Sequence, residues 1–176
     1  MKKIFITVAM AMMLMSCADH SHDFSIYGTV TDPELEGACI FLVPYLEKVI
    51  EPTKENLDST FISGGKFEFH GNVERLSDIR IERRRRINVQ NLLVLTEPGT
   101  INVTIGRVSS SAGTPMNDSL QLWKELTKQY RLEMYEATDQ DVKDSLTLSY
   151  DSRSRQIASN CGGQIATFMK RLFPEK

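Results

Sequence analysis

The residues of this chain that could carry out covalent or redox chemistry begin with its three cysteines. Cys39 and Cys161 lie far apart, and neither belongs to a Cys-x-x-Cys motif, so the sequence has no signature of a dithiol oxidoreductase. Cys39 stands inside the apolar run 38–43, where a free cysteine commonly behaves as a small buried hydrophobic residue. We therefore expect two unpaired thiols, with a disulfide between them as the alternative.

Cys17 ends a segment that has the features of a secretion signal. Residues 2 and 3 are lysines, and residues 4–14 are apolar apart from one threonine. This run is too short to span a bilayer comfortably and has the length of the apolar core of a signal peptide. We expect residues 1–16 to be a signal that is removed and residues 17–23 to form a short polar tether.

The sequence Leu-Met-Ser-Cys at 14–17 resembles the lipobox of bacterial lipoproteins, with Met15 as a less usual middle residue. The resemblance implies a diacylglyceryl group on the Cys17 sulfur, cleavage after Ser16 and acylation, for instance with palmitate, of the new amino terminus. Several acyl chains hold a protein on a membrane where one chain would not. The expected location is the outer membrane of the cell envelope, with the inner membrane or the cell surface as alternatives. An ordinary secretory signal followed by a coincidental cysteine is the competing interpretation.

The strongest run of charge consists of Arg83, Arg84, Arg85 and Arg86, with Arg80 close by. Guanidinium groups could bind lipid phosphates, acidic glycans or the carboxylates of a partner. The alternative, which surface charge runs usually represent, is a solvated loop between two strands. Export from the cytoplasm argues against nucleic acid as the partner.

The histidines offer little further chemistry. His20 and His22 stand beside Asp19 and Asp23, a composition that could hold a divalent metal only weakly without a rigid scaffold. His70 lies near the end of a predicted strand, and no motif places a nucleophile or carboxylate beside it. We expect it to form hydrogen bonds at the rim of a sheet, and we expect no metal site and no cofactor.

No hydrolase or phosphate-binding motif occurs in the sequence. The segment 109–113 is expected to be a flexible junction between two halves of the chain. Trp123, Tyr130, Met134 and Tyr135 could line a groove for a peptide or glycan. At helical spacing, such residues more often form the face that packs against the sandwich.

The chain has 176 residues and a formal net charge of −2. Without residues 1–16 it is long enough for one domain of ordinary size, or for a small domain with an appendage. Its mild acidity indicates neither a nucleic acid partner nor a polyanionic substrate.

Short β-branched and aromatic segments separated by turn residues predict seven strands. They cover 24–30, 38–45, 58–62, 66–70, 78–82, 92–96 and 101–105. Two adjacent glycines between the third and fourth predict a hairpin. The fold class expected from this spacing is mainly β with α: an antiparallel β-sandwich of about seven strands over 24–108.

The periodicity becomes helical after Thr114. Pro115 suits a first helical position behind a threonine cap, and apolar residues recur at helical spacing to Met134. Residues 138–141 read as a capping box that opens a second helix, and a short amphipathic helix follows at 165–172. The segment 109–176 should therefore form a C-terminal helical hairpin.

Several short sequences together resemble the family of the domain of unknown function 4369. They are Gly-Thr-Val at 28–30, Gly-Ala at 37–38, Asp-Ser at 58–59, Gly-Lys-Phe-Glu-Phe-His-Gly at 65–71, Glu-Pro-Gly at 97–99, and Gly-Thr at 113–114 with Asn117. The resemblance implies a sandwich like that of carboxypeptidase-regulatory and transthyretin-like domains, at the front of envelope lipoproteins of Gram-negative bacteria. In that family a thioredoxin-like domain of the AhpC/TSA type often follows. This chain ends at Lys176 without one, so no catalytic residue is carried over.

Two functions from different classes are compatible with the sequence. The first is a non-enzymatic envelope lipoprotein, anchored at Cys17, which binds or supports an unknown envelope protein or glycan. The second is an accessory to thiol-disulfide exchange with a separate thioredoxin-like protein, which requires an exposed thiol of low pKa at Cys39 or Cys161. We favour the first.

Overall fold

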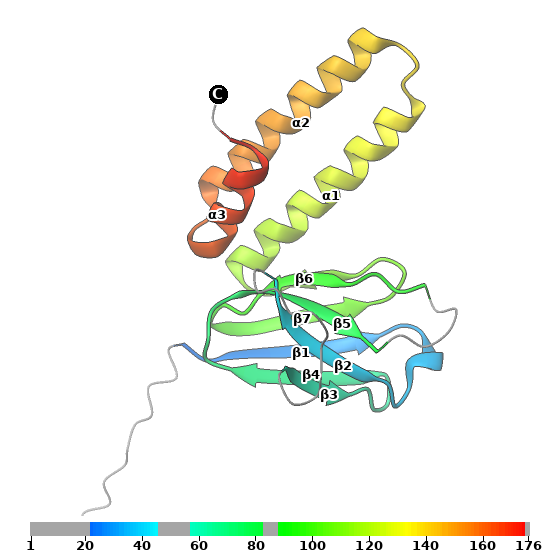
Figure 1. Cartoon of the computed structure of the whole chain (residues 1–176), viewed down its shortest axis with the longest axis vertical. Coiled ribbons are helices and arrows are strands. Elements are labelled where there is room, and N and C mark those ends of the chain that lie inside the picture. The colour runs from blue at the N-terminus through cyan, green and yellow to red at the C-terminus, as the bar shows by residue number, and fades with distance from the viewer. Residues whose placement is uncertain (1–21, 46–56, 83–87, 175–176) are drawn as a thin grey trace, which may run out of the picture.

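The computed structural model describes residues 22–45, 57–82 and 88–174. Two four-stranded sheets lie face to face, and three helices follow them in the chain (Figure 1). The prediction of a β-sandwich followed by a helical region is therefore confirmed. Cys17 and the arginine run 83–86 lie outside the described residues.

The first sheet, called sheet A below, has the strand order β4-β1-β7-β8. Its strands are β1 (Phe24–Val30), β4 (Lys66–Gly71), β7 (Gly99–Ile105) and β8 (Ser110–Ala112). β1 pairs antiparallel with β4 and parallel with β7, and β7 pairs antiparallel with β8. The two central strands, β1 and β7, are thus paired on both sides.

The second sheet, sheet B, has the strand order β3-β2-β5-β6. Its strands are β2 (Cys39–Pro44), β3 (Asp58–Phe61), β5 (Leu76–Ile81) and β6 (Leu92–Leu95), and a short 3-10 helix, η1 (Pro33–Leu35), precedes β2. All three pairings are antiparallel. Every residue of β2 is buried, in agreement with its unbroken apolar sequence.

Two details of the predicted sandwich were wrong. The segment 109–113 is not merely a flexible junction, because residues 110–112 form β8 and pair with β7. The sandwich is also not wholly antiparallel, since β1 and β7 run in parallel. Five described strands, β2 to β6, separate β1 from β7 in the chain and belong to both sheets, so the spacing of neighbouring hairpins does not determine the relative direction of β1 and β7.

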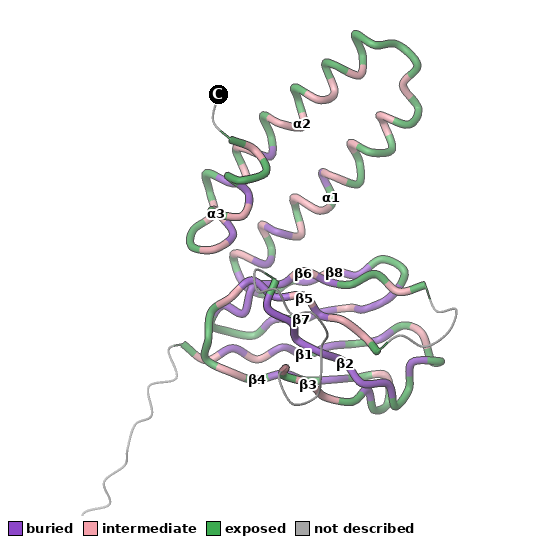
Figure 2. Tube along the Cα trace, viewed as in Figure 1, coloured by how far each residue is buried: buried purple, intermediate pink, exposed green. Residues whose placement is uncertain are grey.

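The main core lies between the inner faces of the two sheets. Buried and exposed residues alternate along β1, β4 and β7, so one face of sheet A is apolar and the other polar (Figure 2). The ring of Phe67 on β4 lies over Gly28 on β1, where an added Cβ would come within 2.0 Å of it. Gly28 therefore provides the space that this aromatic side chain occupies.

The hairpin between β3 and β4 turns at Gly64 and Gly65, which have φ angles of +60° and +69°. The carboxylate of Glu36 accepts hydrogen bonds from the backbone N–H groups of Gly64 (2.9 Å) and Gly65 (3.0 Å). These bonds stabilise the charged form and lower the pKa of Glu36. The predicted hairpin is confirmed, and it is joined to the start of β2 through this carboxylate.

The helices are α1 (Pro115–Glu136), α2 (Gln140–Asn160) and α3 (Gly163–Leu172). α1 and α2 form a long hairpin that projects from one end of the sandwich, with α3 beside its base (Figure 1). Asp139 caps α2 by accepting bonds from the N–H groups of Asp141 (2.8 Å) and Val142 (3.2 Å). The predicted start of this helix at 138–141 is confirmed, but the N-cap is Asp139 and not the first residue of the predicted capping box. None of the described helices is both long and apolar enough to cross a membrane.

The base of the hairpin packs on the outer face of sheet B, at its β5–β6 end. The buried cluster there consists of Leu76, Leu95, Leu120, Ala158, Ile165 and Met169. The side chain of Gln164 adds hydrogen bonds to Leu76 N (2.8 Å) and Glu74 O (3.2 Å). Helices thus cover part of sheet B, whereas the polar outer face of sheet A remains exposed.

Candidate functional site

The exposed outer face of sheet A contains a groove of about 430 Å³. All four strands of the sheet line it. The lining residues are Tyr27, Gly28, Thr29, Lys66, Phe67, Glu68, Asn102, Val103, Thr104, Ser110, Ser111 and Ala112. A concave site to which several elements contribute polar groups is the usual form of a ligand-binding site.

Strand pairing arranges the outward side chains of the groove in two rows that cross the strands. The first row is Glu68, Tyr27, Asn102 and Ala112, and the second is Lys66, Thr29, Thr104 and Ser110. Most of these side chains are small, whereas Tyr27, Lys66 and Glu68 are long. The side chains over β7 and β8 are therefore the shorter ones, and longer side chains on β1 and β4 flank the groove.

The polar groups over β1, β7 and β8 are available to a ligand. Thr29, Thr104 and Ser110 carry hydroxyl groups that both donate and accept, and Asn102 carries an amide that does the same. Among the described residues, no hydrogen bond involves these four side chains. This part of the floor thus presents hydrogen-bonding capacity that the fold itself does not use.

His70 and Tyr27 stand at one side of the groove. The ring of His70 meets that of Tyr27 edge to face, with centroids 5.9 Å apart. Nδ1 of His70 lies 3.0 Å from Ser25 Oγ, and its Nε2 lies 3.4 Å from Glu68 Oε2. The expectation that His70 forms hydrogen bonds on the sheet is confirmed, and these bonds fix the orientation of the ring against Tyr27.

A serine, a histidine and a glutamate in hydrogen-bonded order also occur in hydrolytic enzymes. Here the side chains of His70 and Glu68 are 55% and 60% exposed, on an open sheet surface. Catalytic electrostatic stabilisation depends on a water-excluded site with donors aimed at the developing charge. Ser25, on the central strand β1, belongs to the same open surface, and its contact with His70 orients the ring of His70 against Tyr27.

A second polar cluster joins the sandwich to α1. Oε1 of the buried Glu97, between β6 and β7, accepts bonds from the N–H groups of Met116 (2.8 Å) and Asn117 (3.0 Å). The side chain of Asn117 in turn bonds Leu95 N (3.0 Å) and Leu95 O (2.8 Å), and it donates to Thr114 Oγ1 (2.9 Å).

This cluster corrects one expectation and explains a motif. Thr114 is the N-cap residue of α1 but makes no side-chain cap bond to the helix. Glu97 satisfies those N–H groups instead, and its negative charge suits the positive end of the helix. The Glu-Pro-Gly and Gly-Thr motifs, with Asn117, therefore meet at one structural junction.

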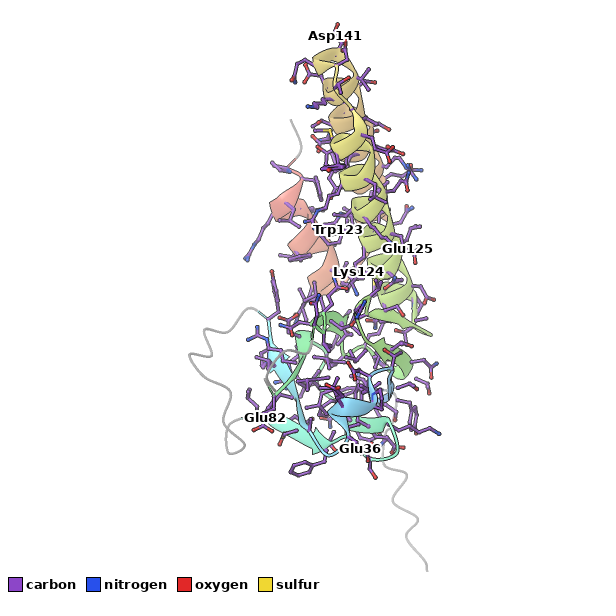
Figure 3. The ribbon with its side chains drawn as sticks, turned by 90° about the vertical axis from the view of Figure 1, so that its right-hand side faces the viewer. Glu36, Glu82, Trp123, Lys124, Glu125 and Asp141 are labelled. Carbon is purple, nitrogen blue, oxygen red and sulfur yellow. The ribbon has the colours of Figure 1, made fainter. Side chains whose placement is uncertain are left out.

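Lys124 lies at the base of α1, above the sandwich (Figure 3). Its Nζ donates a 2.8 Å hydrogen bond to Leu93 O. Burial lowers the pKa of Lys124 to about 8, and this effect is opposed by the nearby charge of Asp78. Because the ammonium group is turned toward β6 and away from the groove, we assign it to the junction of helix and sheet.

Both described cysteines are free, as the sequence predicts. Cys39 is 1% exposed. Cys161 is half-buried, and burial raises its pKa in spite of a hydrogen bond from Ser119. Neither sulfur combines exposure with a lowered pKa, which are the properties of a reactive thiol.

The helical aromatic residues pack chiefly against one another. Trp123 meets Phe168 and Phe173 edge to face, and the ring of Tyr130 stacks on that of Tyr150 at 4.3 Å. The predicted packing against the sandwich is confirmed for Trp123, which contacts the buried cluster at the outer face of sheet B, whereas the ring of Tyr130 packs on Tyr150 of α2. Tyr135, in contrast, is 91% exposed near the tip of the hairpin.

Several other predicted sites lie beyond the described residues. They include Cys17, His20 and the arginines 83–86, while His22 is described and exposed. Within the described ranges, no group of three or more histidine, cysteine, aspartate or glutamate side chains is placed to hold a metal ion. The groove was not predicted from the sequence, although Tyr27 at an alternating polar position of the first strand was a usable signal.

Comparison with known proteins gives one match. The family model described as "Domain of unknown function (DUF4369)" matches residues 24–120, more than half of the chain. No curated protein and no solved structure matches the chain. The matched segment contains the whole sandwich, the groove and the junction with α1. The chain therefore belongs to the DUF4369 family.

Proposed function

We propose that this protein is a non-enzymatic lipoprotein of the cell envelope, and that its sandwich is a binding module. The groove on the outer face of sheet A carries this proposal. It offers unused hydrogen-bonding groups and an exposed aromatic ring on the outer face of sheet A, which α1 borders at the edge strand β8 through the bond from Ser111 N to Gln121 Oε1. Such a surface is suited to ligand binding. The polar cluster at Glu97, in contrast, forms hydrogen bonds that hold α1 on the sandwich.

The anchor in this proposal is Cys17, acylated after removal of residues 1–16, in the outer membrane. Phe24 begins β1, so at most a short segment separates the lipid from the sandwich. A fully extended chain of that length reaches about 25 Å. The binding module would accordingly work close to the membrane surface, on an envelope glycan or protein and not on nucleic acid.

The thiol-exchange alternative receives less support from the described cysteines. Exchange proceeds by attack of an accessible thiolate. Cys39 is buried, and the pKa of Cys161 is raised by burial. We therefore retain the binding module as the proposal.

The anchor is tested by fractionating cells that produce the wild-type chain or the Cys17→Ser variant. We expect the wild-type protein to remain in the membrane pellet through high-salt and alkaline washes, because these release peripheral proteins but not acyl anchors. The Cys17→Ser variant should appear in the soluble fraction, and Cys161→Ser, the matched control, should stay in the pellet. A wild-type protein that is washed off would contradict the proposal.

A further inference from the structure

We propose that the groove on sheet A binds a neutral saccharide chain laid across the strands. This inference rests on the proposed function, because it names the ligand class of the binding module. It follows from the direction of the groove, the chemistry of its side chains and its charge.

The direction of the groove argues for recognition by side chains. The two rows cross four strands, a width of about 14 Å at the usual strand spacing. β1 and β7, which form the middle of the floor, have their backbone groups paired with neighbouring strands. Extended peptides commonly gain affinity by adding a strand to a free sheet edge. A ligand that lies across this floor has no such edge beneath it and must bring its own hydrogen-bonding groups.

The side chains of the groove match the two kinds of surface that a sugar ring presents. Thr29, Thr104 and Asn102 can each donate to and accept from ring hydroxyls, and none of them is used within the described fold. Tyr27 is 43% exposed, and its contact with His70 holds it on the sheet. An aromatic side chain with one polar end offers its apolar body to the C–H face of a sugar.

The charges that line the groove favour a neutral ligand. Lys66 and Glu68 both stand on β4 and have opposite signs, and the lining residues of β1, β7 and β8 are uncharged. An acidic saccharide would be attracted by Lys66 and repelled by Glu68, and it would meet no charged side chain among the other lining residues. The net field therefore does not select a polyanion.

The test is a printed array of neutral and acidic glycans probed with the full-length protein purified from membranes in detergent. Titration calorimetry then measures affinity for the best neutral oligosaccharide. We expect binding to neutral glycans, and we expect Tyr27→Ala and Asn102→Ala each to weaken it at least tenfold. Tyr135→Ala is the matched control, because it removes a tyrosine that is 91% exposed at the far end of the molecule, and it should bind as the wild type does. Circular dichroism checks that all three variants are folded.

Three results would overturn the inference: no binding to any neutral glycan, preference for acidic glycans, or equal binding by the two groove variants and Tyr135→Ala. Capture of an unfolded alkylated polypeptide in competition with the saccharide would identify the groove as a peptide site and would likewise overturn it. The proposed anchor fails separately. If the protein from membranes lacks acyl chains but binds saccharide, the anchor is refuted and the saccharide site is supported. If the protein is acylated but binds no saccharide, the saccharide site is refuted and the anchor is supported.

Discussion

The Glu97 side chain lies where the sandwich meets the first helix. It is buried, and one carboxylate oxygen accepts bonds from Met116 N and Asn117 N. In Glu97→Ala these two N–H groups lose their partner in a place that water reaches poorly. We expect the free energy of unfolding to fall by about 1–3 kcal/mol, measured by urea denaturation at neutral pH.

Glu125→Ala is the control for this prediction. Glu125 is exposed on the same helix and accepts a bond from Gln121. Such an exposed pair contributes about 0.2–0.5 kcal/mol. Equal losses in Glu97→Ala and Glu125→Ala would show that Glu97 does not secure the junction.

Lys124 gives stability a dependence on pH. Its folded pKa of about 8 lies below its ordinary value of 10.5, so the unfolded chain binds more protons between these values. The contribution of Lys124 to stability should therefore rise as the pH increases from about 8 to about 10.5, by up to about 3 kcal/mol. In Lys124→Met this rise should be absent.

The measurement is the difference in unfolding free energy between wild type and Lys124→Met across this pH range. The contributions of all other titratable groups are present in both proteins and cancel in the difference. Lys128→Met, at an exposed position on α1, should follow the wild-type pH profile. Parallel profiles for wild type and Lys124→Met would rule out the assigned pKa.

Individual residues were predictable where their partners are close in sequence. Asp139 caps α2 through N–H groups two and three positions away, and such local spacing was enough to place the start of the helix at 138–141. Glu97 and Asn117 are twenty positions apart, and their bond depends on how the helix meets the sandwich. The sequence contained these residues as a family motif, but their contact could not be derived from it.

At the level of elements, β1 and β4 depend on a glycine. An added Cβ at Gly28 would lie 2.0 Å from the Phe67 ring. Gly28→Ala should therefore force the ring to move and lower the free energy of unfolding by about 1–3 kcal/mol. Thermal and urea unfolding of the variant measure the loss.

The Phe67→Leu background distinguishes this clash from a general effect on the strand. Leucine lacks the distal ring atoms that the new methyl group would meet, so Gly28→Ala should cost less in Phe67→Leu than in the wild type. An additive double mutant would mean that the two residues do not interact.

The helical hairpin should be the least stable element. From residue 127 to 153, no residue of α1, α2 or their connection is buried (Figure 2). Figure 3 places Asp141 at the tip, far from the sandwich. Amide hydrogens in 131–148 should exchange at least about ten times faster than those in β1 and β7, because local opening of the distal hairpin exposes little apolar surface. Hydrogen exchange with mass spectrometry tests this, and equal protection would mean that the distal hairpin is covered.

Sequence patterns predicted the helices and seven strands because each has its own periodicity or turn signal. β8 was missed, since Ser110–Ala112 has neither β-branched residues nor apolar alternation and is a strand through its pairing with β7. The groove was missed for a related reason. Its residues come from four strands, and only the parallel register of β1 and β7 brings Tyr27 beside Asn102.

At the scale of the whole molecule, the apolar and polar faces of the two sheets determine which surface is exposed to a ligand. The inner faces form the core, and the helices pack on part of sheet B. The polar face of sheet A remains, with its groove, on a module that we propose is held near a membrane by Cys17. This exposed polar face is the surface on which the proposed binding function depends.

The most direct test of this account is the intact mass of the protein taken from native membranes and alkylated without reduction, beside a reduced sample. We predict a mass equal to residues 17–176 plus acyl chains and two alkylated thiols, those of Cys39 and Cys161. An unacylated product, whether full-length or cleaved, would contradict the lipoprotein that we propose. Thiols that become reactive only after reduction would contradict the two free cysteines.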